Sequence, residues 1–453
     1  MTLAQQVPDQ HGPRLGRALQ HRFRAAVAIG RRSQLPSRSV GLIRTTSEPA
    51  GPPWLARAAL VASLACILGA TLAPVGTEFQ PDFVSCVICG SREWADAVAN
   101  LLLYAPLGAA LAWTGRVGWR PVFYAFLLSA CIELSQTVIP GRDPSLGDVT
   151  FNTLGAAAGQ LGAVLARRWL VPDVLPAARC SLAAAALAAA SFAFTGMLLA
   201  PEFPTTTLGV WYAPALPEMS WYHARVLSAR IGPIRLHTGP LSNAGDVRRS
   251  LLTGAPLGIE AIAGPPVPTL GPLLVFEDVG ANQIYLVGPD RTDLVLRYQT
   301  RAAHRGLDQP DIRLRGAFAT VGSGDTIRID IHRQGVGYCL SLNSLERCRL
   351  GYSIGAAWAM VLYPRHWPPW AYALLGAMWV GGLALPVGLW SRRRVETILA
   401  VALFGGAAAL VPPLVALSAT PAREWWGAVL GWGAGVALQA VLRRRGSVSA
   451  TGS

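Results

Sequence analysis

The chain has 453 residues, of which 52% are hydrophobic and only 14% are charged, and its formal net charge is +14. Because a soluble domain usually carries about 25% charged residues, this composition argues against a soluble enzyme and against a disordered protein. All 39 basic residues are Arg. Such uniform usage is typical of GC-rich coding rather than of a nucleic-acid-binding surface, so we expect no nucleic-acid partner.

The first segment, residues 1–53, is rich in Arg and has no apolar period. Its only acidic residues are Asp9 and Glu48. A run of like charges with so little apolar content predicts a disordered tail, which we place on the cytoplasmic side of a membrane.

Apolar blocks of about 20 residues, the length that spans a bilayer as a helix, follow this tail. We place eight spans near residues 54–75, 95–114, 120–139, 149–166, 180–200, 369–390, 396–418 and 424–442. The predicted fold class is a mainly α-helical polytopic membrane bundle with an inserted β domain. The expected domains are the tail (1–53), a five-span membrane domain (54–200), the β domain (201–365), three C-terminal helices (366–445) and a short tail (446–453).

Arginine clusters predict the orientation, since Arg-rich short loops stay on the cytoplasmic side. With the first tail inside, every cluster between or after spans is cytoplasmic: Arg116 and Arg120; Arg167, Arg168 and Arg179; Arg392, Arg393 and Arg394; Arg443, Arg444 and Arg445. The opposite loops hold only Arg92, Arg142 and Arg423. Both termini are therefore expected in the cytoplasm and residues 201–365 on the outer side.

The 201–365 segment alternates between apolar and polar residues as β-strands do. Short alternating runs occupy 283–287 and 293–298, separated by a Gly-Pro-Asp-Arg-Thr turn, and 325–332 and 336–342 repeat the pattern. Alternation places one face of each strand in a core and the other in water. We therefore predict a two-sheet sandwich, and we find no helical period of useful length in this segment.

Four of the seven cysteines lie on the predicted outer side, where disulfides persist. Cys339 ends a strand and Cys348 follows a turn, so we expect them to pair. Cys86 and Cys89 are expected to form a short structural disulfide, with a redox or metal-binding C-x-x-C as the alternative. The remaining cysteines fall within spans, where we expect them to pack without reacting.

Ionisable and amide side chains inside spans are costly, so each is a functional candidate. Asp96, Asn100 and Tyr104 lie at i, i+4 and i+8 and share one helix face. The same outer third of the second to fourth spans also holds Glu133, Gln136, Arg142, Asp148 and Asn152. We predict a ligand-binding cluster open to the outer side, with a polar knot that only fixes helix register as the alternative.

These residues resemble the motifs of the VanZ-like family over about residues 54–170. Asp96-x3-Asn100-x3-Tyr104-x-Pro-Leu-Gly108 is similar to its first motif, and the second and third correspond to Glu133-x2-Gln136-x3-Pro140-x-Arg142 and Asp148-x3-Asn152-x2-Gly155-x3-Gly159. Gly155 and Gly159 are expected to let the fourth span pack closely against a neighbour. Many family members carry His where this chain has Asn100, and Asn cannot relay protons.

The family resemblance implies an integral protein of the bacterial inner membrane that acts in envelope maintenance, or in resistance to glycopeptides of the teicoplanin type. The outer segment, about 220–348, resembles a concanavalin A/laminin G-type jelly roll in its strand pattern, its 297–315 stretch and the hairpin ending near Asn343. That second resemblance implies carbohydrate binding. Oxygen ligands for Ca²⁺ are available, but their spacing favours solvated turns over a metal site: Asp278, Asn282, Asp290, Asp293 and Asp325.

Three classes of function are compatible with this pattern. The favoured one is a non-enzymatic protein that binds an envelope lipid or a lipid-linked or peptidoglycan glycan, with no cofactor and no metal. The alternative is a membrane enzyme in which Glu133 and Asp148 act as general acid and base on a lipid-linked glycan or phosphate. A transporter is disfavoured, because the last three spans carry almost no internal charge and no inverted repeat is visible.

Overall fold

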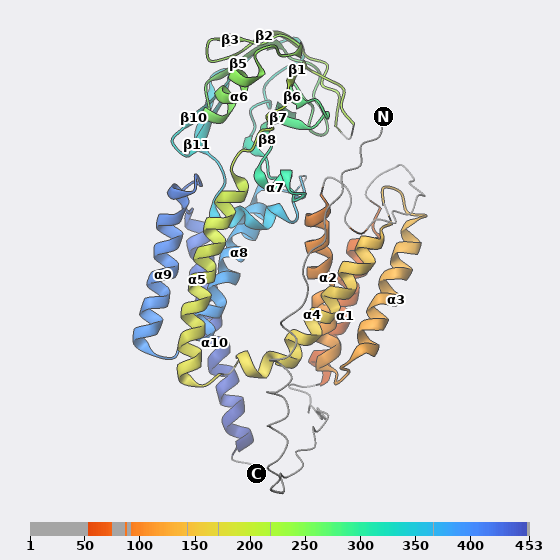
Figure 1. The fold of residues 1–453 in the computed structure, drawn as a ribbon, viewed down its shortest axis with the longest axis vertical. Helices are drawn as coiled ribbons and strands as arrows, with labels where there is room; N and C mark the ends of the chain where they lie inside the picture. Colours follow the sequence, from red (N-terminus) through yellow and green to blue (C-terminus); the bar gives the residue numbers. More distant parts are fainter. Residues whose placement is uncertain are drawn as a thin grey trace, which may run out of the picture. The chain divides into compact units, whose positions relative to one another are not determined.

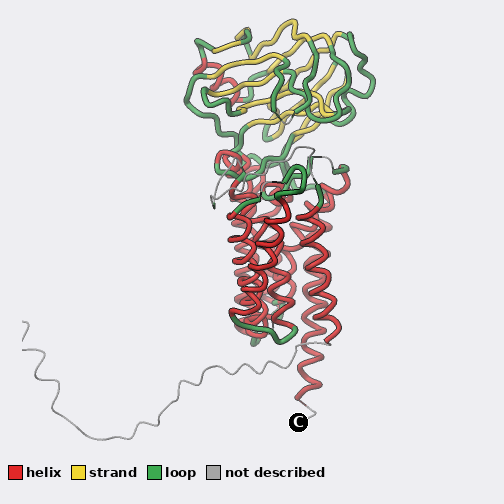
Figure 2. Tube along the Cα trace, turned by 90° about the vertical axis from the view of Figure 1, so that its right-hand side faces the viewer, coloured by secondary structure: helices red, strands yellow, loops and turns green. Residues whose placement is uncertain are grey.

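The computed structural model describes residues 53–74, 87, 92–142, 144–170, 172–217, 219–365 and 367–450. The expected Arg-rich tail, up to residue 52, lies outside this part of the chain, as do Cys86 and Cys89. The predicted fold class is confirmed: long apolar helices are combined with two antiparallel β-sheets (Figures 1 and 2).

Eight long helices form at the positions of the eight predicted spans. They are α1 (Pro53–Leu72), α2 (Glu93–Trp113), α3 (Trp119–Gln136), α4 (Leu146–Leu170), α5 (Val174–Leu199), α8 (Pro369–Leu389), α9 (Arg394–Leu414) and α10 (Ala422–Ala450). In the described residues, seven of these helices are long and apolar enough to cross a membrane, and α3 is not among the seven. Arg120, Glu133 and Gln136 fall within the 18 residues of α3, so no stretch of it is as apolar as the spans of the other seven helices.

The packing of α2 against α4 nevertheless requires α3 to run the same distance as its neighbours. Gly155 of α4 lies against the Leu101 carbonyl of α2, and Gly159 lies against the Ala105 carbonyl one turn later. The residue numbers of the contacting pairs increase together along both helices, so α2 and α4 are parallel. The chain must therefore return along α3 between them, and a bilayer crossed by α2 and α4 is crossed by α3 as well.

Glycine contacts of this kind also join α8 and α10. Gly427 and Gly431 of α10 lie against the carbonyls of Ala377 and Gly381 of α8, and this register again increases along both helices. Small residues spaced four apart let helix backbones approach closely in a membrane, where no hydrophobic effect drives helices together. The Gly427-x3-Gly431-x3-Gly435 spacing is the sequence signature of this second pair.

The membrane helices pack mainly in two groups, α1 to α4 and α5 with α8 to α10 (Figure 1). The sequence placed α5 with the first four spans, whereas in the structure its principal helix partners are α9 and α8. Phe192 of α5 and Phe404 of α9 meet edge to face, with ring centroids 5.5 Å apart. Between the groups, the indole nitrogen of Trp390 donates to the Trp169 carbonyl at 2.6 Å.

Exposed apolar side chains cover the outer faces of these helices. Leu134, Leu187 and Leu414 are 72%, 70% and 81% exposed, respectively. Soluble proteins rarely expose so much contiguous apolar surface, so this surface indicates contact with lipid. Exposed Trp residues stand near helix ends, as in interfacial aromatic belts: Trp54, Trp94, Trp119, Trp370 and Trp426.

The β domain consists of two six-stranded antiparallel sheets. The first has the order β4-β1-β6-β7-β8-β9 and the second β12-β11-β10-β5-β2-β3. The strands are β1 (Leu208–Tyr212), β2 (Arg225–Ile231), β3 (Ile234–Arg235), β4 (Gly239–Pro240), β5 (Leu257–Ile262), β6 (Leu274–Asp278), β7 (Gln283–Asp290), β8 (Asp293–Tyr298), β9 (Ile312–Leu314), β10 (Thr326–Gln334), β11 (Gly337–Leu342) and β12 (Leu345–Leu350).

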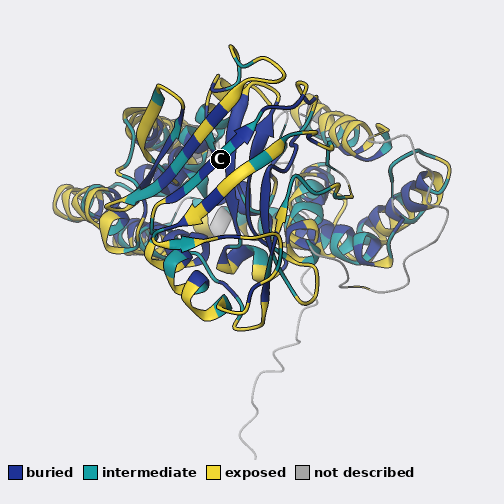
Figure 3. Cartoon of the chain, turned by 90° about the horizontal axis from the view of Figure 1, so that it is seen from above, coloured by how far each residue is buried: buried dark blue, intermediate teal, exposed yellow. Residues whose placement is uncertain are grey.

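The two sheets share one hydrophobic core. Phe276 and Leu294 of the first sheet belong to the same buried cluster as Ile329 and Leu340 of the second. Residues of β10 alternate between exposed and buried, as the sequence pattern predicts, and Figure 3 shows buried and exposed stretches along the strands. β8 is buried throughout its length, because a smaller apolar cluster around Val295 covers its other face.

Three short helices complete this domain: α6 (Ala244–Thr253), α7 (Arg301–His304) and the 3₁₀ helix η1 (Ile354–Met360). The expectation of no helix in this segment is therefore wrong. α6 has only Val247 and Leu251 buried, so its apolar stripe is too short to stand out in the sequence. η1 is tied to α10 by the buried Glu424, which accepts from the Ser353 hydroxyl and from the Gly355 amide.

A buried ion pair lies on the edge of the first sheet. Arg297 Nε donates to Asp311 Oδ1 at 2.7 Å, and Arg313 donates to the other oxygen at 2.8 Å. Burial acts to raise the pKa of the Asp311 carboxyl, but the guanidinium groups of Arg297, Arg313 and Arg365 together more than offset burial and hold this pKa below its usual range. Burial acts to lower the pKa of Arg297, but the Asp311 carboxylate raises it above its usual range.

The close contact between α2 and α4 predicts that one methyl group added at the contact destabilises the protein. A Cβ at Gly159 would collide with the Ala105 carbonyl, whereas a Cβ at Gly162 of the same helix meets nothing within 4 Å. We expect Gly159→Ala to destabilise the protein by about 1–3 kcal/mol through overpacking. Gly162→Ala should be neutral or slightly stabilising, since Ala favours helix. Thermal unfolding in detergent measures both, and equal stability of the two variants would contradict the close contact.

The Arg297–Asp311 pair predicts acid sensitivity of the β domain. Its contribution is complete above the unfolded pKa of Asp, about 3.9, and is lost as pH falls through the lower folded pKa. Asp311→Asn leaves the buried Arg297 without its counter-charge, which should lower the free energy of unfolding by about 3–5 kcal/mol. The same substitution should flatten the dependence of stability on pH below about 4. Denaturant titrations at several pH values test this expectation, and an unchanged acid slope in Asp311→Asn would refute it.

Candidate polar site of the membrane helices

The start of α4 is fixed by two hydrogen bonds around Ser145. The Gly147 amide donates to the Ser145 hydroxyl at 3.0 Å, so Ser145 caps the helix. The amide of Ser145 itself donates to Glu133 Oε2 at 2.8 Å. In a capping box this donor would bond to the acid three residues after the cap, here Asp148. Glu133 of α3 takes that role, which joins α3 to the start of α4.

Asp148 bonds instead to α2. Asn100 Nδ2 donates to Asp148 Oδ1 at 2.8 Å, between helices whose backbones are held close by glycine. One turn further into the bundle, Asn152 Nδ2 donates to the Ser129 hydroxyl of α3 at 2.9 Å. Tyr104 is fully buried at this level. The amide pairs therefore connect α4 to both α2 and α3.

Two other predicted residues bond to the end of α1. Gln136 Nε2 donates to the Thr71 carbonyl at 3.0 Å. Arg142 Nε and Nη2 donate to the carbonyls of Ala73 and Ala70 at 3.0 and 2.6 Å. The last carbonyls of a helix have no partner within the helix, and positive charge is favourable beside them. Gln136 and Arg142 thus act as caps of α1.

Asp96 lies in the first turn of α2 and is exposed. It is within electrostatic range of Asp148 and Arg92.

The first turn of α2 also contacts the β domain. The amides of Trp94 and Ala95 both donate to the Gly306 carbonyl at 3.0 Å. Arg92 forms an ion pair of 2.9 Å with Asp308, whose side chain is only 2% exposed. A loop of the β domain therefore lies against the start of α2, beside the cluster.

All eight predicted ligand-binding residues lie around this end of α2, α3 and α4. Asp96, Glu133 and Asp148 form no ion pair with any described residue. Arg142 is near enough to interact electrostatically with Glu133 and Asp148, but its hydrogen bonds go to α1. The cluster therefore has an excess of carboxylate oxygens, which accept hydrogen bonds from hydroxyl, amide or ammonium groups.

The sequence missed three contributors to this site. Ser129 lies four residues before Glu133 on the same face of α3, a spacing that was available as a signal. Ser145 begins a Ser-x-x-Asp pattern ahead of an apolar run, which is a capping signature. The α1 carbonyls carry no side-chain signal, so only the structure places them beside Gln136 and Arg142.

In the β domain a disulfide joins Cys339 and Cys348, which links β11 to β12. Of the described residues, His332, Cys339 and Glu346 bring three potential metal-ligand atoms within 4.8 Å of one another. The sulfur of Cys339 is used by the disulfide, so a thiolate ligand is not available while that bond persists. The free cysteines of the described residues, Cys66, Cys131 and Cys180, lie on membrane helices.

These features define a class: a polytopic helical membrane protein with a β domain attached at the ends of its helices. Within it, residues 63–167 match the VanZ/LLP1 family model. The matched range runs from α1 through most of α4 and includes the whole polar cluster, so this part of the chain is VanZ-like. Comparison with curated proteins and with solved structures gives no match.

The Glu133–Ser145 bond predicts different outcomes for two substitutions of one residue. Glu133→Gln keeps a carbonyl oxygen that can accept from the Ser145 amide, so its stability should stay within about 1 kcal/mol of wild type. Glu133→Ala leaves that amide without its acceptor, which costs about 1–3 kcal/mol. Thermal unfolding in detergent separates the two. Equal loss in both variants would show that the charge, rather than the hydrogen bond, supports the fold.

Proposed function

We propose that the VanZ-like helices bind a lipid or glycan of the bacterial cell envelope at the polar cluster. The observation that carries this proposal is the set of carboxylates without an ion pair among described residues, Asp96, Glu133 and Asp148. Polar networks that serve only as structural contacts usually satisfy their own charges. Here surplus acceptors lie at the end of the helices that contacts the β domain, where hydroxyl or ammonium groups of a headgroup or sugar can bond to them.

The ligand that fits best is one rich in hydrogen-bond donors. Of the described arginines near the three carboxylates, the Arg142 guanidinium already caps α1 and Arg92 is paired with Asp308. A phosphate at this position would be repelled by Glu133 and Asp148, whereas sugar hydroxyls or an ethanolamine group would not. Envelope maintenance and a response to glycopeptides of the teicoplanin type are the biological roles we attach to such binding, in keeping with the VanZ-like resemblance.

A membrane enzyme is the second candidate. Glu133 is 2% exposed and forms no ion pair with a described residue. Asp148 is half-buried and accepts a hydrogen bond from Asn100. Two carboxylates in unlike environments can divide the roles of general acid and general base. Chemical conversion of the bound lipid or glycan distinguishes this candidate from simple binding.

We also propose that the β domain lies on the outer side of the inner membrane, as a unit distinct from the helices, with both termini in the cytoplasm. The arginine clusters favour this orientation. The Cys339–Cys348 disulfide favours it as well, since such bonds persist outside the cytoplasm. Within this unit, carbohydrate binding by the two-sheet sandwich is part of the same proposal.

The binding proposal predicts that the carboxylates matter and that a remote acid does not. Purified protein in phosphate-free detergent is titrated with phosphatidylethanolamine and with a soluble peptidoglycan fragment. We expect Asp148→Asn and Glu133→Gln to weaken binding by about tenfold each, the loss of one charge-assisted hydrogen bond. Asp246→Asn, an exposed acid on α6, should bind as wild type does.

Mass spectrometry of the ligand after incubation completes this experiment. Unchanged ligand with weaker binding in the variants supports the binding protein. Ligand altered by wild type but not by Glu133→Gln supports the enzyme. Equal binding by wild type, Asp148→Asn and Glu133→Gln would leave the cluster as a helix contact and defeat both candidates.

The orientation predicts the redox state of the β domain. When intact cells are treated with a membrane-impermeant thiol reagent, Cys339 and Cys348 should be labelled only after a reductant is added, because they are paired on the outer side. Peptide mass spectrometry reads the labels. Labelling of both cysteines without reductant would contradict the disulfide. No labelling after reduction, while lysed cells are labelled, would contradict the proposed side of the membrane.

A further inference from the structure

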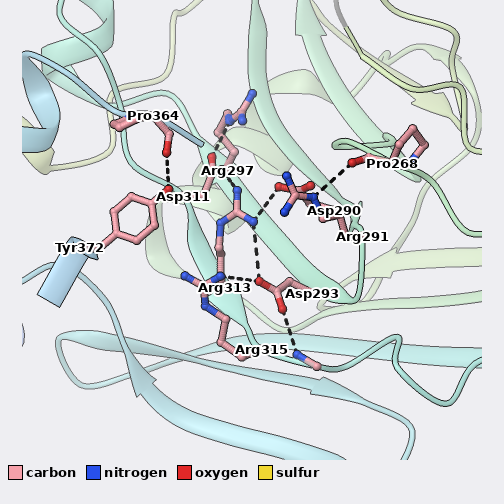
Figure 4. Close-up of polar contacts among 11 residues, drawn as sticks. Pro268, Asp290, Arg291, Asp293, Arg297, Asp311, Arg313, Arg315, Pro364 and Tyr372 are labelled. Carbon is pink, nitrogen blue, oxygen red and sulfur yellow. Dashed lines mark hydrogen bonds and ion pairs between the residues drawn. The ribbon is translucent and has the colours of Figure 1, made fainter. Parts of the chain in front are cut away.

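A cavity of about 460 Å³ lies at the base of the β domain, where the chain leaves the sheets and begins α8. Its walls combine four arginines and two acids: Arg291, Arg313, Arg315, Arg365, Asp290 and Asp293. Figure 4 shows most of these side chains meeting around Arg313 and Asp293. The positive charges in the wall outnumber the negative ones by two.

The two acids are already bonded by arginines of the same wall. Asp290 pairs with Arg313 at 2.7 Å. Asp293 accepts from Arg315 at 2.6 Å through one oxygen and from the Gly316 amide at 3.0 Å through the other. Asp293 also lies 3.7 Å from Arg313, so both carboxylates are engaged by arginines of the wall.

Arg365 shares its acidic partner with another arginine. Its ion pair with Asp308 is 3.7 Å long, and Asp308 is shared with Arg92 at 2.9 Å. Asp308 also accepts from the amides of Gln309 and Tyr363. The Nε of Arg365 is buried without a hydrogen-bond partner among the described residues. Burial, and next the Arg297 guanidinium, lower the pKa of Arg365, as expected where positive charge is in excess.

The cavity also lies at the level where α8 enters the membrane. Trp367, Pro368 and Pro369 form its remaining wall, and Pro369 is the first residue of α8. Trp367 and Trp370 are 44% and 68% exposed, as expected of Trp at the headgroup level of a bilayer. The amino end of a helix carries partial positive charge, which favours an anion at this position.

We propose that this cavity binds a phosphate group, that of a membrane lipid headgroup or of a soluble phosphate, through Arg315 and Arg365. Arginine binds phosphate with two parallel hydrogen bonds and retains its charge at any physiological pH. The volume exceeds that of one phosphate, which leaves space for the headgroup atoms attached to it. This site is separate from the acid-rich cluster of the VanZ-like helices and does not depend on its function.

The test uses the full chain in a phosphate-free maltoside detergent, with isothermal titration calorimetry. The probes are dihexanoyl phosphatidylglycerol, inorganic phosphate and dihexanoylglycerol, which has the acyl chains but no phosphate. Arg315→Gln and Arg365→Gln are the variants, and both side chains are partly exposed, at 43% and 35%. Arg328→Gln, on an exposed face of β10, is the control. Thermal unfolding confirms that each variant is folded.

We expect wild type and Arg328→Gln to bind phosphatidylglycerol equally, and each cavity variant to bind about tenfold more weakly, the effect of one lost charge-assisted contact. Tighter binding of phosphatidylglycerol than of inorganic phosphate assigns the site to a lipid headgroup, and equal binding assigns it to free phosphate. Binding of dihexanoylglycerol as tight as that of phosphatidylglycerol, an equal loss in Arg328→Gln, or no binding of either phosphate by folded wild type overturns the proposal.

Discussion

The close backbone contact between α2 and α4 is the constraint on which the VanZ-like part of the structure depends. Gly108, Gly155 and Gly159 each face a carbonyl of the opposite helix with no room for a side chain. Only at this separation can the short side chains of Asn100 and Asp148 meet directly. In a bilayer the polar groups of a protein must form hydrogen bonds with one another, because no water is available. The same contact therefore also fixes where α3 and the end of α1 bond to the cluster.

Charge is distributed unequally along the helix ends that contact the β domain. The cluster of α2 to α4 has surplus carboxylates, whereas the cavity at the start of α8 has surplus arginines. Asp308 pairs both with Arg92, beside the cluster, and with Arg365 of the cavity wall, and so connects the two. A ligand with a phosphate next to hydroxyl or ammonium groups, as in many envelope lipids, carries both kinds of complementary charge. The two proposed sites therefore suit two parts of one class of molecule, although each is argued from its own residues.

Much of this organisation follows from the sequence, and the exceptions have physical reasons. Spacings of three and four residues place Asn100, Tyr104 and Glu133 on faces that contact neighbouring helices, because helix geometry is regular, whereas Asp96 of the same pattern is exposed. Alternation along 325–332 marks β10, whose burial follows the same period. The contacts of α5 with α8 and α9 join segments about 200 residues apart, which no local pattern encodes. α6 buries only Val247 and Leu251, and the caps on α1 use backbone carbonyls. Asp290 and Asp293 were expected as solvated turn residues, but distant arginines bind them.

The glycine contact between α2 and α4 sets the Asn100–Asp148 bond. The most direct measurement is the coupling free energy of these two side chains, from a double-mutant cycle with Asn100→Ala and Asp148→Ala in detergent. It is determined once in the wild-type background and once in Gly159→Ala. The structure predicts a coupling of about 0.6–1.7 kcal/mol in the wild-type background and its loss when the helices are forced apart. Equal coupling in both backgrounds would contradict the claim.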